Sequence, residues 1–280
     1  MAGLRQASPA VALAAALLAA IPLGFSQDPG VVADVPYVAS PQAVVDEMLR
    51  LAQAGPGDVV YDLGSGDGRV VITAAVKFGA RGIGLEIDPA MVERSRANVV
   101  RAGVADRVRI VQQDLFDTEL APATVITLYL APHLNLRLRD RLLRLRPGTR
   151  IVSHSSDLGD WKADRRSAIG KDVLLWVVPA RVAGRWRVVG KALAPGSLEI
   201  RFEQRFQELS GQARLDGEPL GLWEAKLDGA KLQFVIVDPR SGASLYFSGL
   251  VSEHAIVGEV ARDVGAARTV STWRAIRLPH

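Results

Sequence analysis

The sequence has no cysteine among its 280 residues. It therefore has no disulfide framework, no thiolate nucleophile and no cysteine ligands for zinc. A strong charge of one sign is also missing, because 34 Lys and Arg stand against 30 Asp and Glu, for a formal net charge of +4. Such a weak excess does not by itself indicate a nucleic-acid partner. Hydrophobic residues make up 49% and charged residues 23% of the chain, as in a globular protein with a sizeable core.

A hydrophobic run long enough for a membrane span is missing too. The apolar stretch at residues 11–23 is too short for such a helix. Arg5 before it, and Gly24 and Ser26 after it, give the pattern of a secretory signal cleaved ahead of Gln27. We therefore expect residues 1–26 to direct export to the periplasm or envelope, with residues 27–35 as a linker. A cytoplasmic protein is expected if the segment is not a functional signal, and membrane contact only if it stays uncleaved.

The most informative stretch is a glycine-rich turn after a short apolar run. Residues 59–63 predict a buried strand, and residues 70–78 have the apolar spacing of a helix. Between them, Gly64, Gly66 and Gly68 permit positive φ and let a ligand lie against bare backbone. The free N–H groups of the helix N-terminus would face that ligand.

The spacing of this turn excludes two common ligands. A dinucleotide fingerprint requires a small third residue, and that position is Arg69 here. The G-K-[ST] signature of a phosphate-binding loop is missing as well. Asp62, directly before the turn, disfavours pyrophosphate and favours a cationic or hydroxyl-bearing ligand.

Two further acidic residues follow the next predicted strands. Glu86 ends the strand at residues 82–86, where a carboxylate matches the vicinal hydroxyls of a ribose. Asp114 follows the strand at residues 108–113, where an acid can accept a hydrogen bond from an adenine amine.

Taken in order, Asp62 to Gly68, Glu86 and Asp114 resemble the first three motifs of class I S-adenosylmethionine-dependent methyltransferases. Residues 35–38 and 153–161 further resemble one subgroup, the bacterial relatives of the mitochondrial protein-lysine methyltransferases, which are distantly similar to Dot1-type histone enzymes. The resemblance covers about residues 35–180. It implies a Rossmann-like α/β sheet with flanking helices at residues 36–180.

The resemblance also implies S-adenosylmethionine as the cofactor and a protein or small-molecule methyl acceptor. A nucleic-acid acceptor is not expected, because the chain lacks the Asn/Asp-Pro-Pro-Tyr/Phe motif that holds ring amines and amides. No metal site is expected, and the oligomeric state stays open. The predicted cofactor residues are Asp62, Gly64, Ser65, Gly66, Gly68, Glu86 and Asp114.

Two residues are candidates for the reacting centre. Tyr129 ends the predicted strand at residues 124–130, the end that faces the methyl group in this superfamily. His154 ends the next predicted strand, at residues 149–154. Each has an alternative reading, Tyr129 as a core ring and His154 as a structural histidine. Four further residues are predicted to line the acceptor site: Tyr37, His133, Asp157 and Trp161, the last as a wall of a lysine channel.

Two helices near this site show different signals. Ser40 and Pro41 predict an N-cap followed by proline at the first helical position. Residues 134–146 combine leucines at helical spacing with a dense run of arginines. That run predicts either a solvated helix face or a patch for an acidic partner.

From residue 181 to residue 280 the pattern changes to short alternating strands separated by glycine turns. Eight such segments predict an all-β domain, either an antiparallel barrel or a curled sheet. They lie at residues 186–189, 198–209, 213–215, 222–227, 232–237, 245–250, 255–260 and 269–276. The domain carries no acid–base constellation, so we expect it to bind, dock or stabilise. The alternative for the whole chain is an exported binding protein with a relic methyltransferase fold.

Overall fold

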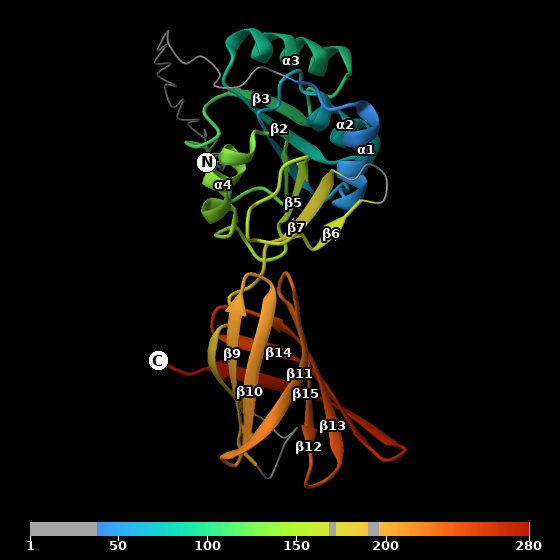
Figure 1. Ribbon diagram of the computed structural model, residues 1–280. Helices are drawn as coiled ribbons and strands as arrows, with labels where there is room; N and C mark the ends of the chain where they lie inside the picture. Colours follow the sequence, from blue (N-terminus) through green and yellow to red (C-terminus); the bar gives the residue numbers. More distant parts are fainter. Residues whose placement is uncertain (1–37, 168–171, 190–195, 280) are drawn as a thin grey trace, which may run out of the picture. The chain divides into compact units, whose positions relative to one another are not determined.

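The computed structural model describes residues 38–167, 172–189 and 196–279, which form a mixed sheet and a closed barrel (Figure 1). The signal-like segment, the linker and Tyr37 lie outside the described residues. Within the described part, no helix is long and apolar enough to cross a membrane.

The mixed sheet has seven strands. Five adjacent strands run parallel to one another. The last two strands of the sheet run antiparallel to their neighbours. This is the predicted Rossmann-like sheet. In spatial order its strands are β3 (Val108–Gln112), β2 (Arg81–Glu86), β1 (Val59–Leu63), β4 (Val125–Leu128), β5 (Arg150–His154), β7 (Val173–Val177) and β6 (Arg165–Arg166).

Four helices flank the sheet: α1 (Gln42–Leu51), α2 (Arg69–Phe78), α3 (Pro89–Arg101) and α4 (Pro132–Leu142). The apolar residues of α1 and α2 share one core with one face of the sheet, and α3 packs beside α2. Leu138 and Leu142 of α4 belong to a different core, together with Ile126 and Ile151. Both faces of the sheet are thus covered, as parallel strands require.

The predicted start of α1 is wrong by one residue. Pro41 occupies the N-cap position with ψ of 146°, and α1 begins at Gln42. No side chain of the described residues makes a capping hydrogen bond to the helix. The Ser40 hydroxyl is instead hydrogen-bonded to His154, far along the chain.

The strand order creates one preferred place for a ligand. The chain moves outward from β1 to β2 and β3, then returns to form β4 on the other side of β1. Crossovers leave β1 and β4 in opposite directions, so a crevice opens at the carboxyl ends of these strands. Residues that follow β1, β2, β4 and β5 meet at this edge.

The barrel consists of eight antiparallel strands and closes where β15 pairs with β8. This confirms the predicted all-β domain as a barrel. Its strands are β8 (Gly184–Val189), β9 (Leu198–Arg205), β10 (Glu208–Leu215), β11 (Glu218–Asp228), β12 (Lys231–Asp238), β13 (Ala243–Val251), β14 (Ala255–Val264) and β15 (Ala267–Arg277).

One predicted strand is divided in the structure. Residues 198–209 were expected to form a single strand, but β9 ends at Arg205 and β10 begins at Glu208. The chain reverses at Phe206, which has a φ of 55°. A phenylalanine in the left-handed backbone conformation is unusual, and no glycine or proline in the sequence indicates this turn.

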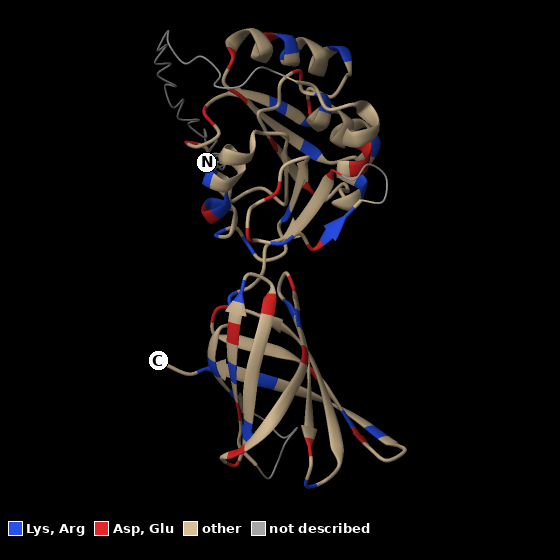
Figure 2. Cartoon of the chain, viewed as in Figure 1, with Lys and Arg blue, Asp and Glu red and all other residues tan. Residues whose placement is uncertain are grey.

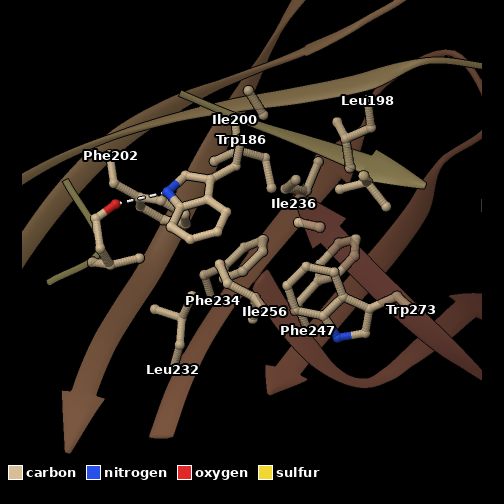
Figure 3. Packing of buried hydrophobic residues seen from close by; sticks show 14 of the residues in the cluster. Trp186, Leu198, Ile200, Phe202, Leu232, Phe234, Ile236, Phe247, Ile256 and Trp273 are labelled. Atoms are coloured by element: carbon tan, nitrogen blue, oxygen red, sulfur yellow. Dashed lines mark hydrogen bonds between the residues drawn. The ribbon is translucent and has the colours of Figure 1, made fainter. Parts of the chain in front are cut away.

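Aromatic side chains fill the interior of the barrel (Figure 3). Phe234 stacks on Phe247 at 4.7 Å between ring centroids and meets the edge of Trp273 at 5.8 Å. Phe202 packs against Phe234 at 5.5 Å. The Trp186 indole donates to the Val182 carbonyl oxygen at 2.7 Å, so its polar atom is satisfied. The interior is therefore a packed core, as expected for a small barrel.

Candidate functional site

The glycine turn after β1 is a tight backbone loop held to β2. The N–H groups of Gly64 and Ser65 both donate to the Leu85 carbonyl oxygen, at 2.9 and 2.8 Å. Gly64, Gly66 and Gly68 have φ of 80°, 53° and 81°, values that side chains disfavour. α2 begins directly after Gly68 and directs its N-terminus at the same edge.

Glu86 is fixed at the end of β2 by three backbone donors. Its Oε2 accepts from the Gly66 N–H at 2.8 Å, and its Oε1 accepts from the N–H groups of Ile87 and Asp88 at 2.9 and 3.0 Å. The side chain is 9% exposed. A carboxylate held so rigidly at the crevice is preorganised for a vicinal diol.

Asp62 is buried beneath the turn. Its Oδ1 accepts from the Thr127 hydroxyl at 2.7 Å. Burial, together with the neighbouring carboxylates of Glu86 and Asp67, raises the pKa of Asp62 to about 7, against the lowering effect of the Thr127 hydrogen bond. A cation bound at this edge would favour the ionised form. The site is therefore electrostatically suited to a positively charged ligand.

Two more predicted cofactor residues lie at this edge. Ser65 Oγ is buried and has no hydrogen-bond partner among the described residues. Asp114 follows β3, where its Oδ1 accepts from the Phe116 N–H at 2.8 Å and orders the loop. The seven predicted cofactor residues are thus gathered at or beneath the carboxyl ends of β1, β2 and β3, and their chemistry fits a cationic nucleoside.

Tyr129 and His154 meet at the ends of β4 and β5. Their rings stack with centroids 4.1 Å apart and an interplanar angle of 29°. Tyr129 is 37% exposed, whereas His154 is 9% exposed. The Ser40 Oγ lies 2.9 Å from His154 Nδ1. Burial lowers the pKa of His154, while Asp172 opposes this change.

Comparison with known proteins identifies the family. The model of the ANTKMT methyltransferase domain matches residues 62–165. A protein-lysine N-methyltransferase of Saccharolobus islandicus (strain REY15A) is 41% identical over 129 residues, covering 45% of this chain and 80% of that protein. The chain belongs to the class I S-adenosylmethionine-dependent methyltransferases. Within them it is related to the protein-lysine methyltransferases.

Two other relatives bear on the acceptor. The mouse adenine nucleotide translocase lysine N-methyltransferase is 37% identical over 130 residues, or 46% of this chain and 56% of that enzyme. The crystal structure of an RNA methyltransferase from Salinibacter ruber, in complex with S-adenosyl-L-homocysteine, is 50% identical with a TM-score of 0.51. It covers 52% of this chain and 96% of the other. This methyltransferase therefore spans most of two relatives but only about half of the mouse enzyme.

The predicted acceptor-lining residues of the methyltransferase have different environments. His133 lies exposed in the first turn of α4, and Asp157 lies exposed in the loop after β5. Trp161 is fully buried, and its carbonyl oxygen accepts from the Trp176 indole at 2.7 Å. The prediction that Trp161 walls a lysine channel is corrected, because the ring belongs to the hydrophobic core shared with α4.

The arginine run of the methyltransferase makes internal contacts. Arg137 lies over the Phe116 ring at 3.7 Å, and Arg139 pairs with Asp160. Arg141 donates to the Leu115 carbonyl oxygen at 3.0 Å. Lys and Arg residues and Asp and Glu residues are both spread over the barrel strands (Figure 2). Much of the run therefore stabilises α4 and its loops.

Sequence reasoning missed two residues that organise this site. Ser40 appeared to be a helix cap, and Asn135 had no signal beyond its place in a helix. Asn135 is fully buried, and its amide donates to Ser153 Oγ and to the Ser156 carbonyl oxygen, both at 3.2 Å. It ties α4 to the loop that follows β5.

The barrel of the methyltransferase carries a groove of about 360 Å³. Apolar side chains from four strands form part of its lining: Val235, Tyr246, Ala261 and Val270. Charges of both signs stand around them: Glu224, Lys226, Glu259 and Arg268. Across the described residues, no group of His, Asp and Glu is arranged to hold a metal ion. That the barrel binds or docks stays a prediction.

Proposed function

We propose that this methyltransferase transfers a methyl group to the ε-amine of a lysine in a protein acceptor. The observation that carries the proposal is the meeting of the Glu86-anchored turn with the stacked Tyr129 and His154 at one edge of the sheet. Lysine-specific enzymes among the relatives support the acceptor class.

When bound, the cofactor supplies a methyl group on a sulfonium sulfur, ready for in-line transfer to a nucleophile. The residues of the chain supply orientation and charge. Glu86 presents a fixed carboxylate for the ribose, and Asp62 favours positive charge nearby. The half-exposed ring of Tyr129 offers a π-face to an ammonium group. Partial burial of that ammonium lowers its pKa and frees the amine electron pair.

RNA is a second candidate acceptor, favoured by the similarity to the RNA methyltransferase from Salinibacter ruber. The two candidates are distinguished by whether protein or RNA receives the methyl group. A small-molecule acceptor would share the same cofactor site. A relic fold that only binds is disfavoured by the Glu86 carboxylate, which three backbone donors still hold in place.

The test begins with calorimetric titration of the full chain with S-adenosylmethionine. We expect Glu86→Lys to abolish binding, because a cation replaces the ribose acceptor. Glu93→Lys is the matched control, since Glu93 is 76% exposed on α3 and should leave binding unchanged. Unchanged affinity in the Glu86 variant would contradict the placement of the cofactor site. Failure of the unaltered chain to bind S-adenosylmethionine would contradict the proposed enzymatic activity.

The acceptor is then identified with a cell extract and a cofactor carrying a radiolabelled methyl group. We expect the label in protein, recovered as methyl-lysine after acid hydrolysis. Label that ribonuclease releases would show an RNA acceptor, and label in neither polymer would show a small molecule. Either of these outcomes overturns the lysine proposal.

A further inference from the structure

Ser40 joins the segment before α1 to the end of β5. Its Oγ lies 2.9 Å from His154 Nδ1, and both side chains are buried, at 5% and 9% exposure. The backbone of Ser40 is fixed as well, because the Arg69 guanidinium donates to its carbonyl oxygen at 2.8 Å. The hydroxyl is therefore held in place on one side of the imidazole.

Tyr129 holds the imidazole on another side. The two rings stack at 4.1 Å, and Tyr129 is the more exposed of the two. A molecule that approaches the end of β4 would meet the Tyr129 ring beside the His154 edge.

The loop after His154 is held by hydrogen bonds to neighbouring segments. Ser155 adopts a φ of 68°, and its N–H donates to the Asp172 carbonyl oxygen at 2.6 Å. The Ser156 hydroxyl donates to the Leu130 carbonyl oxygen at 2.9 Å, which ties the loop after β5 to the loop after β4. Local strain of this kind is concentrated at functional sites. The loop thus fixes where the imidazole lies.

When one ring nitrogen of a neutral histidine makes a hydrogen bond, the role of that nitrogen as donor or acceptor decides whether the other nitrogen carries a proton. If Nδ1 carries the proton and donates to Ser40, Nε2 carries an electron pair. If Ser40 donates to Nδ1, Nε2 carries the proton instead. The sulfonium of a bound cofactor and the ammonium of an acceptor would favour the first arrangement, because an electron pair attracts positive charge and an N–H group repels it.

Burial, and not a neighbouring charge, keeps the imidazole neutral. Burial favours the uncharged imidazole near pH 7, although Asp172 favours the charged form. A neutral imidazole with a free electron pair can accept a proton.

We propose that Ser40 is a positioning residue that holds His154 as the Nδ1–H tautomer, so that Nε2 accepts a proton from the acceptor ammonium beside Tyr129. In that step an N–H bond of the ammonium breaks and its electron pair stays on nitrogen. The proton binds Nε2, and the imidazolium later releases it to water. The inference rests on the proposed transfer to an amine.

The first test needs no activity. Ring ¹⁵N spectra of the protein saturated with S-adenosylmethionine distinguish the two tautomers, and only four histidines need assignment. We expect the Nδ1–H tautomer in the unaltered chain and in Ser40→Thr, and a mixture in Ser40→Ala. Ser210→Ala, at an exposed position of β10, should leave the spectrum unchanged. An Nε2–H tautomer in the unaltered chain would overturn the inference.

The second test uses the pH profile of methyl transfer. We expect Ser40→Ala to lower kcat by about tenfold, the scale of one lost hydrogen bond, with a shifted acidic limb and unchanged cofactor affinity. Ser40→Thr should restore both rate and profile, which a general packing defect would not allow. If the enzyme is active and Ser40→Ala leaves its pH profile unchanged, this inference is contradicted but the proposed function is not. If the chain does not methylate amines, the proposed function is contradicted, and the tautomer measurement remains valid.

Discussion

At the scale of single residues, Asp62 shows how the fold changes the chemistry of one group. A carboxyl that would be ionised in water has its pKa raised to about 7 by burial under the glycine turn. The Thr127 hydroxyl donates to its Oδ1 and favours the ionised form. The charge of the site near neutral pH thus depends on one buried proton.

We predict that the cofactor expels this proton. At pH 6 the Asp62 carboxyl is mostly protonated, and a bound cation lowers its pKa, so binding should release up to about one proton. Affinity should therefore rise as pH rises from 6 through 7. Calorimetry at pH 6 in two buffers of different ionisation enthalpy measures the released proton.

Cofactor binding to the Asp62→Asn variant should release no proton. The Asp106→Asn variant is the control, because the Asp106 side chain is 72% exposed, and it should release as much as the unaltered chain. Equal heats in both buffers would show that Asp62 keeps its protonation state on binding.

The glycine turn and the acids at the strand ends could be placed from the sequence, because the residues of each signal are adjacent in the chain; their role in cofactor binding stays a prediction. Glycines at 64, 66 and 68 and an acid at each strand end report directly on the ligand. The Ser40–His154 hydrogen bond was not predictable, because 114 positions separate its partners. Only the assembled sheet brings them together.

At the scale of elements, the start of α2 depends on a close approach to α3. Gly68 occupies the N-cap of α2 with a φ of 81°, and a Cβ built there would collide with Ser95 Oγ of α3. The hydroxyl of Ser95 is itself buried without a partner among the described residues. The position is therefore restricted by both backbone angle and packing.

We predict that Gly68→Ala destabilises the protein more than Gly103→Ala. Gly103 also has a positive φ, 68°, but its Cβ would meet no atom within 4 Å. Gly103→Ala should lower the free energy of unfolding by roughly 1–2 kcal/mol from backbone strain. Gly68→Ala should cost roughly 1–3 kcal/mol more from overpacking.

Urea denaturation followed by circular dichroism measures both changes. Adding Ser95→Ala to Gly68→Ala should bring the cost down to that of Gly103→Ala. A double variant no more stable than Gly68→Ala would show that the clash is not the cause.

Helices and strands with a strong local sequence signal were predicted well. Elements that lack such a signal were not. The parallel strands follow from apolar runs between glycine and proline turns. The division between β9 and β10 was missed because Phe206 makes its turn without glycine, and β6 was missed because it has only two residues. Tertiary pairing decides such elements.

At the scale of the whole molecule, the chain builds separate hydrophobic cores. The core of the barrel is made from residues 180–275, while the cores of the mixed sheet draw their buried members from residues 45–178. The barrel interior has its own aromatic cluster around Phe234. Damage to one core need not reach the other.

We predict that Phe234→Ala lowers the free energy of unfolding of the barrel by about 3–5 kcal/mol, because it leaves a cavity among the aromatic rings around it. Affinity for S-adenosylmethionine should stay unchanged. Thermal melts give the first quantity and calorimetry the second. Trp223→Ala is the control, since Trp223 is 61% exposed and should change stability by less than about 0.5 kcal/mol.

A large loss of cofactor affinity in Phe234→Ala would show instead that the barrel supports the methyl-transfer site. The presence of eight barrel strands was predictable from their spacing. Their closure was not, since a curled open sheet has the same local pattern.

Closure of the barrel also sets the order of its assembly. Trp186 in the first strand pairs with Arg277 in the last, so the ring is completed only after nearly the whole second half of the chain has left the ribosome. Contacts this distant in sequence make folding slow. Until β15 arrives, β14 and β8 present unpaired edges that can recruit strands from other molecules. Shortening the chain by this last strand would make such exposed edges permanent and turn a closed domain into an aggregating one.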